Sequence, residues 1–248
     1  MRFSVRSDTG LIRTVNEDSF FIKSSYENLP DIYIIADGMG GHNAGEIASK
    51  TAAEYTGEVL LNTPGAFLEE ENLTASIIEA MEKANQKVFE MSKAKSENSG
   101  MGTTLIAAVV YGKKLYIGHI GDSRVYILKK GIISKITSDH SLVEELLRSG
   151  TLTKEEAENH PKKNIITRAI GCSVVIDVDL YEYDIENGDI ILMCTDGLTN
   201  MVNENQIRDI VQNSKDLGTA SENLINKANE NGGEDNTTVI LFRIDGVD

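Results

Sequence analysis

The sequence is organised around residues 32–42, which read Ile-Tyr-Ile-Ile-Ala-Asp-Gly-Met-Gly-Gly-His. The apolar run 33–36, bounded by Pro30 and Gly38, is typical of a buried β-strand. Asp37 should then stand where this strand leaves the core. The glycines after it allow the backbone to turn sharply and to approach whatever the carboxylate holds. Asp-Gly is also a common turn dipeptide, so this stretch alone favours a plain turn. The rest of the chain favours a site.

The same arrangement recurs later in the chain. Residues 189–197 form another apolar run that ends in an Asp-Gly pair at Asp196, and Asp235 stands at the entrance of the apolar run 239–243. Asp122 lies in a link between two expected strands. Carboxylates gathered in this way repel one another unless they are far apart or cations lie among them. Hard divalent cations take oxygen ligands of this kind.

The link before the apolar run 19–22 carries Arg13, Glu17 and Asp18. Taken alone, it reads as a solvated turn with a local ion pair. Beside a metal site, however, an arginine can grip a phosphate through two parallel hydrogen bonds. Two divalent ions about 3.5–4 Å apart can share one carboxylate and activate a water molecule. Carboxylates that can bind metal ions, together with one arginine that can bind a phosphate, therefore indicate phosphate-ester hydrolysis.

Composition limits the class of protein. The chain has 248 residues, 40% of them hydrophobic, and a formal net charge of −15. This charge argues against nonspecific binding to nucleic acid or to anionic membranes, which needs basic patches. Nothing resembles a signal peptide, and no apolar run approaches the roughly 20 residues of a membrane span. Cys172 and Cys194 lack a zinc-site spacing. We expect a cytoplasmic protein without membrane insertion.

The periodicity alternates between runs of helices and runs of strands. An edge strand is expected at 1–7, and helices are expected at 44–61, 73–95, 142–148, 205–211 and 216–229. Four strands punctuated by glycines, at 103–110, 113–118, 124–128 and 132–136, indicate an antiparallel meander. A further strand is expected at 176–183. This order favours an α+β layered domain over a parallel sheet.

Six motifs now stand in order along the chain. They are Arg13 with Asn16-Glu17-Asp18, Ala36-Asp37-Gly38-Met39-Gly40-Gly41-His42, Met101-Gly102-Thr103-Thr104, Gly121-Asp122-Ser123-Arg124, Thr195-Asp196-Gly197 and Asp235-Asn236-Thr237-Thr238. In this order they resemble the PP2C-type, metal-dependent serine/threonine protein phosphatases, in particular the compact bacterial members. The motifs run from residue 13 to residue 238, so we expect a single phosphatase domain over 1–248.

The resemblance implies a fold and an activity. The fold would be a four-layer α-β-β-α sandwich, with two central antiparallel sheets flanked by antiparallel helix pairs. The activity would be hydrolysis of phosphoserine and phosphothreonine monoesters on proteins by a hydroxide that two Mn²⁺ or Mg²⁺ ions activate. The expected partners are phosphorylated proteins, namely a bacterial serine/threonine kinase and its substrates, and the protein would be a monomer.

The resemblance also implies metal ligands at matching positions. Asp37 would bridge the two ions. The Gly38 carbonyl would bind the first ion, and Glu17 would reach that ion through water. Asp196 and Asp235 would hold the second ion.

Further positions have implied roles around this centre. Asp122, together with Asp196, would form the third-metal site of bacterial relatives, and Arg13 would bind the substrate phosphate. Asp18 would either hydrogen-bond metal-bound water or orient the Arg13 region. Residues 142–165 match the variable flap that lies beside the site in this family.

One departure concerns the general acid. Many eukaryotic members carry a histidine directly after Asp-Gly, where this chain has Met39. His42 fits the bacterial pattern and could protonate the leaving alkoxide. A metal-bound water could do the same, and His42 could instead cap the helix that follows.

Other functions were weighed against this one. A Ser-His-Asp hydrolase is disfavoured because no Gly-x-Ser-x-Gly elbow is present. His119 and His140 therefore read as structural residues, with Ser141 as a helix cap. Three roles stay open for Arg168: it positions the flap, lines the site or forms a structural ion pair. A catalytically inactive binding module is disfavoured because the metal acids and Arg13 are all present. Dephosphorylation of small metabolites stays open.

Overall fold

Strand β3 (Asp31–Met39) is the central element of the fold in the computed structural model, which describes residues 2–24, 30–40, 44–63, 65, 67, 69–158 and 160–246. Residues 32–36 are fully buried because both faces of the strand are covered. β3 pairs antiparallel with β2 (Asp18–Lys23) on one side and with β5 (Leu105–Tyr111) on the other. The apolar run of the opening stretch is thus a central strand, as its composition predicts.

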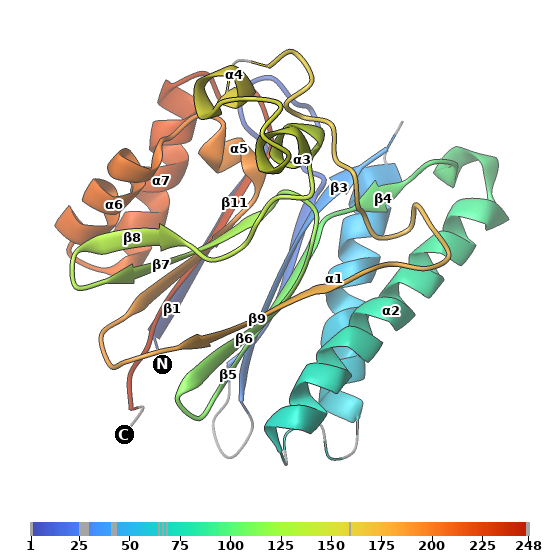
Figure 1. Ribbon diagram of the computed structural model, residues 1–248, viewed down its shortest axis with the longest axis horizontal. Helices are drawn as coiled ribbons and strands as arrows, with labels where there is room; N and C mark the ends of the chain where they lie inside the picture. The colour runs from blue at the N-terminus through green and yellow to red at the C-terminus, as the bar shows by residue number, and fades with distance from the viewer. Residues whose placement is uncertain are drawn as a thin grey trace.

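Two antiparallel sheets form the middle of the molecule (Figure 1). The first has the order β2-β3-β5-β6-β9, with β4 also paired to β3; its remaining members are β4 (Gly102–Thr103), β6 (Lys114–Ile120) and β9 (Asp179–Asp184). The second has the order β1-β11-β10-β7-β8; its members are β1 (Arg2–Asp8), β7 (Arg124–Lys129), β8 (Ile132–Lys135), β10 (Ile190–Cys194) and β11 (Thr237–Arg243). β1 is an edge strand, as expected.

Helices cover the outer face of each sheet (Figure 1). α1 (Ala44–Asn62) and α2 (Glu70–Ala94) pack on the first sheet, and α6 (Glu204–Asn213) and α7 (Leu217–Glu230) pack on the second. Two short helices, η1 (Ser96–Asn98) and α5 (Asp196–Thr199), complete these layers. The expected four-layer α-β-β-α sandwich is confirmed.

Three apolar cores hold the layers together, one between each pair of neighbouring layers. In the core between the sheets, the ring of Tyr33 stacks on the ring of Phe242 with centroids 4.0 Å apart. In the core under α1, the small residues Ala48 and Ala52 are fully buried and let this helix approach β2 and β3 closely. Burial of each large apolar side chain stabilises the fold by about 1.5–3 kcal/mol.

The expected meander is wrong in one respect. β5 pairs with β6 and β7 pairs with β8, but β6 and β7 belong to different sheets. The link at 121–123 therefore crosses from one sheet to the other. Gly121 has φ +110°, and a Cβ at this position would lie 2.5 Å from the Thr104 methyl group, so only glycine fits the crossing. The crossing places Asp122 at the end of the interface between the sheets.

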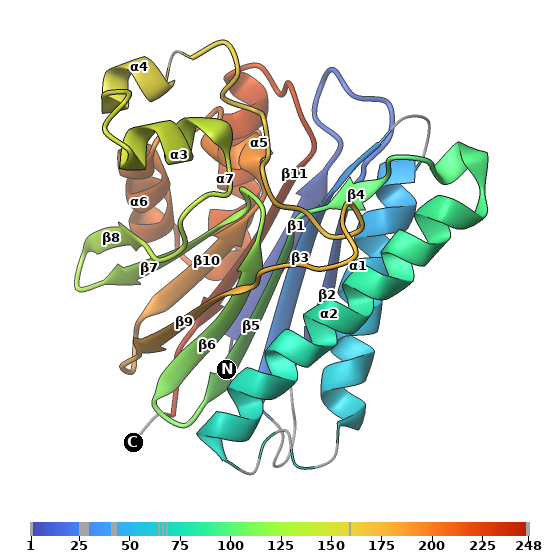
Figure 2. The same cartoon turned by 45° about the vertical axis from the view of Figure 1, so that its right-hand side comes forward.

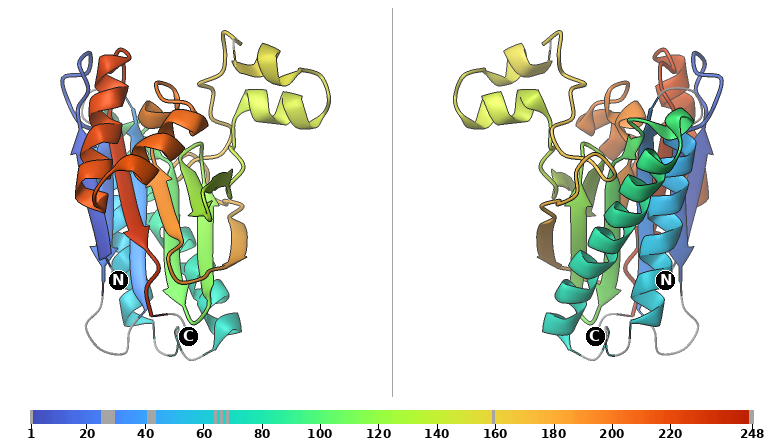
Figure 3. Two further views of the ribbon diagram at one scale, coloured as in Figure 1. Left: turned by 90° about the vertical axis from the view of Figure 1, so that its left-hand side faces the viewer. Right: turned by 90° about the vertical axis from the view of Figure 1, so that its right-hand side faces the viewer.

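Residues 142–165 form a projection beyond the strand ends, at the end of the sandwich that also carries the loop 9–17 (Figures 2 and 3). It contains α3 (Leu142–Arg148) and α4 (Lys154–Glu158). Ser141 caps α3, because its hydroxyl accepts a hydrogen bond from the Glu144 N–H. Both chain ends lie at the opposite end of the sandwich. Within the described ranges, none of the helices is long and apolar enough to cross a membrane.

Candidate metal and phosphate site

Asp37 lies inside strand β3, two residues before its end, and not at the exit of the strand as the sequence suggested. β4 extends the pairing past it. Two threonines fix its backbone: the Asp37 N–H donates to Thr104 Oγ1 at 2.9 Å, and Thr103 Oγ1 donates to the Asp37 carbonyl at 2.8 Å. Asp18 is its direct partner across the β2–β3 ladder. The carboxylate therefore stands on rigid backbone.

Gly38 is needed for close approach and not for the sharp turn that the sequence suggested. Within the described chain it is not among the residues with positive φ. A Cβ on Gly38 would lie 2.2 Å from the Gly45 carbonyl oxygen and 2.6 Å from that of Glu17. A Cβ on Gly45 would meet Glu17 Oε1 at 2.4 Å. The start of α1 and the Glu17 segment thus press directly on the backbone that follows Asp37.

Asp196 and Asp18 come from different sheets: Asp196 follows strand β10 of the second sheet, and Asp18 is the first residue of β2 in the first sheet. Asp196 is the first residue of α5, and its carboxylate accepts a hydrogen bond from Asn200 Nδ2 at 3.0 Å. Thr195 Oγ1 donates to Asp18 Oδ2 at 2.9 Å. A Cβ on Gly197 would lie 2.1 Å from the Asn236 carbonyl oxygen. This close packing brings α5 against the segment that carries Asp235.

Arg13 meets Asp235 at the rim of the cluster. Its Nη2 lies 2.9 Å from Asp235 Oδ2, and its side chain is half exposed. No separate role was predicted for Asn236, yet this buried side chain organises the rim. Its Oδ1 accepts from the Glu17 N–H, and its Nδ2 donates to the Thr9 and Val15 carbonyls. Asn236 was visible only as part of a motif, because its partners lie more than 200 positions away.

The electrostatics of the cluster are those of crowded acids. Burial first, then Asp18, Asp196, Asp122 and Asp235, raise the pKa of Asp37 well above its usual range. Burial, followed by the nearby carboxylates, raises the pKa of Asp122 to about 8 and that of Asp18 to about 7. Burial and Asp235 also raise the pKa of Asp196, which accepts a hydrogen bond from Asp37. Without a cation the cluster binds protons.

The donor set suits a hard divalent cation. Oδ1 of Asp18 and Oδ1 of Asp122 are buried without a hydrogen-bond partner among the described residues. Oxygen donors with free lone pairs are what Mg²⁺ and Mn²⁺ bind. In the part of the chain that the structure describes, no three His, Cys, Asp or Glu side chains converge enough to hold an ion by themselves. Such ions keep several waters, so carboxylates spaced in this way fit them.

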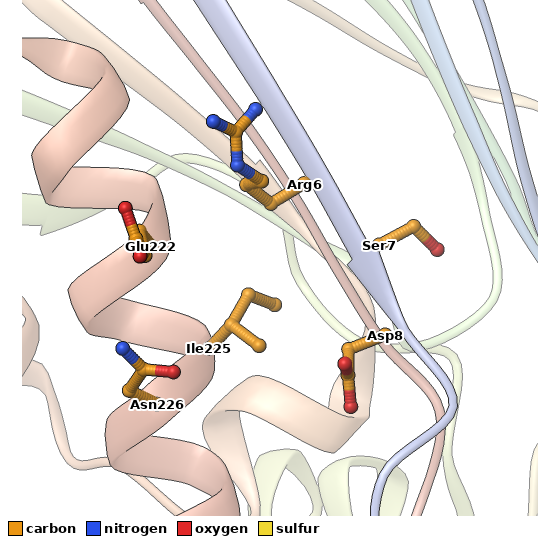
Figure 4. Close-up of a pocket in the computed structure, with 6 residues that line it drawn as sticks. All are labelled: Arg6, Ser7, Asp8, Glu222, Ile225 and Asn226. Carbon is orange, nitrogen blue, oxygen red and sulfur yellow. The ribbon is translucent and has the colours of Figure 1, made fainter.

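His42, the candidate general acid, falls outside the described residues. A shallow pocket of about 260 Å³ opens between β1 and α7, and it is lined by Arg6, Ser7, Asp8, Glu222, Ile225 and Asn226 (Figure 4). None of the residues predicted for the site lines this pocket.

Comparisons with known proteins agree with this arrangement. The family described as Protein phosphatase 2C matches residues 13–229. The "Serine/threonine phosphatase stp" of Listeria monocytogenes serotype 4b is 40% identical over 245 residues, which cover 99% of this chain and 96% of that protein. The serine/threonine phosphatase of S. agalactiae has a solved structure with TM-score 0.92 and 37% identity, covering 98% of this chain and 99% of that one.

A third relative is the catalytic domain of the serine/threonine protein phosphatase PstP, solved in complex with two manganese ions. It has TM-score 0.83 and 33% identity, and the match covers 97% of this chain and 96% of that one. The fold is that of these serine/threonine phosphatases. The chain belongs to the protein phosphatase 2C family.

The stability of the metal-free protein should depend on pH in a defined direction. Folded Asp122 keeps a proton that the unfolded chain releases above about pH 4. The contribution of Asp122 to the free energy of unfolding in chelator should therefore be fully present below about pH 4 and should be lost as the pH rises towards about 8. Asp122→Asn should stabilise the metal-free protein at about pH 8 by roughly 1–3 kcal/mol, the cost of a buried polar group without a partner. Urea unfolding measures this difference.

Asp139 provides the matched control. Although burial opposes them, Arg124 and Lys135 lower its pKa, and Arg124 donates to both of its carboxylate oxygens. Asp139→Asn should therefore destabilise the protein at the same pH. Equal effects of the two substitutions would contradict the assignment of uncompensated charge to Asp122.

Proposed function

We propose that this chain hydrolyses phosphoserine and phosphothreonine monoesters on proteins with the aid of two divalent ions, Mn²⁺ or Mg²⁺. The observation that carries the proposal is the cluster of buried, uncompensated carboxylates with the Arg13 guanidinium at its rim. The names of the relatives support the substrate class, because these proteins are serine/threonine phosphatases. A relative that holds two manganese ions supports the cofactor.

In this proposal the ligands are the residues that the sequence singled out. Asp37 would bridge the two ions, the Gly38 carbonyl would bind the first, and Glu17 would reach that ion through water. Asp196 and Asp235 would hold the second ion. Bound ions supply a nucleophile from water at neutral pH and neutralise the phosphate charge.

The protein's own residues then position the substrate. Arg13 extends from a loop that Leu11 pins to the Gly233 carbonyl at 2.7 Å, so its guanidinium stays at the rim. Its exposed half can donate two hydrogen bonds to a phosphate. One carboxylate oxygen of Asp18 accepts a hydrogen bond from the Thr195 hydroxyl, and the other oxygen is available to accept one from a water in the cluster. Asp122, with Asp196, offers a third metal site.

The remaining assignments follow the same family pattern. We propose one phosphatase domain over 1–248, with residues 142–165 as the flap, acting as a monomer in the bacterial cytoplasm. Its partners would be a serine/threonine kinase and the proteins that this kinase phosphorylates. His42 remains the candidate general acid, in competition with a water of the cluster.

The direct test is turnover of a phosphothreonine peptide. Mn²⁺ or Mg²⁺ should be required, because the proposed nucleophile is a water molecule that becomes reactive at neutral pH only when the ions bind it. Phosphate release is measured with each metal, and with excess EDTA as the control. Release that continues in EDTA would rule out the proposed chemistry, and peptide binding without any release would make the chain a binding module.

Arg13 should contribute to phosphate binding. Arg13→Ala should lower kcat/KM for the peptide by roughly 10–100-fold, because a hydrogen bond to a charged group contributes about 1.5–3 kcal/mol. Arg6→Ala is the matched control, since Arg6 is exposed on β1 beside the separate pocket and donates to the Val5 carbonyl. If both variants kept wild-type kinetics, Arg13 would have no role in substrate binding.

A further inference from the structure

His140 lies where three parts of the molecule meet: the flap, the link that carries Asp122, and strand β9. Its side chain is almost fully buried. Its backbone N–H donates to the Gly121 carbonyl at 2.8 Å, and its carbonyl accepts from the Thr167 N–H at 2.8 Å. The flap begins two residues after His140 and ends two residues before Thr167. His140 therefore sits in the neck through which the flap joins the sandwich.

The ring of His140 bonds in two directions. Its Nδ1 accepts a hydrogen bond from the Gly121 N–H at 3.1 Å, so Nδ1 carries no proton. The proton must then be on Nε2, which lies 3.0 Å from Asp179 Oδ2 and donates to it. One edge of the ring thus holds the backbone next to Asp122, and the other edge holds the first residue of β9.

A second histidine, His119, bonds the residue that follows Asp122. His119 Nε2 donates to the Ser123 carbonyl at 3.0 Å, and its ring lies against that of His140 with centroids 4.8 Å apart. The residues on either side of Asp122 are therefore each held by an imidazole. The Ser123 hydroxyl also bonds Thr104 Oγ1 at 2.9 Å, and the same Thr104 oxygen accepts from the Asp37 N–H. The contacts run without a break from His140 to Asp37.

The other edge of the ring leads to the flap. Asp179 Oδ1 accepts from Arg168 Nη1 at 2.8 Å, and Arg168 lies three residues after the end of the flap. The two chain segments of the neck are also joined directly, because the Leu142 N–H donates to the Ile165 carbonyl at 2.9 Å. Asp179 therefore fixes both His140 and Arg168, one on each side of the neck.

We propose that His140 is a positioning residue that joins the flap neck and the Asp122 link into one unit. The Nδ1 edge holds Asp122 at the carboxylate cluster, and the Nε2 edge, through Asp179, holds the flap against the sandwich. This inference rests on the proposed function in one respect, because it takes Asp122 and the flap as parts of the phosphatase site. It makes the placement of Asp122 depend on a contact with the neck of the flap.

Two substitutions of His140 separate the two edges. In His140→Asn the amide oxygen takes the place of Nδ1 and can still accept from Gly121, but Asp179 loses its donor. In His140→Gln the amide nitrogen takes the place of Nε2 and can still donate to Asp179, but the Gly121 N–H loses its acceptor. Each variant is the matched control for the other. Asp179→Asn should also loosen the neck as His140→Asn does, because its amide offers one acceptor oxygen where two donors, His140 Nε2 and Arg168 Nη1, each need one.

The first readout is amide hydrogen exchange of the metal-free protein, which is independent of activity. Protection of the Gly121 amide should fall by about tenfold in His140→Gln, because its N–H loses its hydrogen-bond acceptor. It should be retained in His140→Asn and Asp179→Asn, in which the Leu142 and Thr167 amides should exchange faster instead.

The second readout is the kinetics with Mn²⁺ and a phosphothreonine peptide. His140→Gln should lower kcat by about tenfold or more with KM little changed, as for other groups that orient metal ligands. His140→Asn and Asp179→Asn should raise KM with kcat little changed. A general loss of packing would instead change kcat, KM and amide protection together in all three variants.

The proposal is overturned if the two His140 variants change the same amides and the same kinetic constant, or if neither changes any of them. If both His140 variants fail to fold, Asp179→Asn decides: faster exchange at the neck with Gly121 still protected supports the proposal, and loss of Gly121 protection overturns it. If the wild type does not release phosphate, the proposed function fails, while the exchange data still decide the role of His140.

Discussion

The main constraint on this structure is the mutual repulsion of four carboxylates that the fold holds in one cluster. They belong to Asp37, Asp18, Asp122 and Asp196. Burial raises the pKa of each of them, and their neighbours raise it further. Such a cluster costs free energy unless protons or cations enter it. Natural chains retain costly arrangements of this kind at functional sites. The apolar cores between the four layers supply the stability that offsets the cost.

Backbone contact, more than side-chain packing, brings the acids together. Gly38 against Gly45, Gly197 against Asn236 and Gly121 against Thr104 are all contacts in which a Cβ would lie closer than about 2.6 Å to its neighbour. Each of these glycines stands next to one of the acids in sequence. The sandwich therefore positions its carboxylates by letting backbones touch, which leaves little freedom for the carboxylates to move apart and relieve their repulsion.

Much of this could be predicted from sequence, and the exceptions have physical causes. The apolar runs before Asp37 and Asp196 were recognisable because a buried strand is apolar on both faces. The six motifs in order led to the correct family and the correct layers. The meander was mispredicted because spacing alone does not show that Gly121 adopts a positive φ and sends the chain to the other sheet. The roles of Asn236 and His140 depend on distant partners, so local patterns could not indicate them.

The central claim is that the carboxylate cluster is a paired metal centre. Calorimetric titration of Mn²⁺ into the wild type, Asp196→Ala and Asp122→Ala tests it most directly. The account predicts that the wild type binds a pair of ions, that Asp196→Ala loses the pair, and that Asp122→Ala keeps it. Unchanged binding in Asp196→Ala, or no binding to the wild type, would contradict the account.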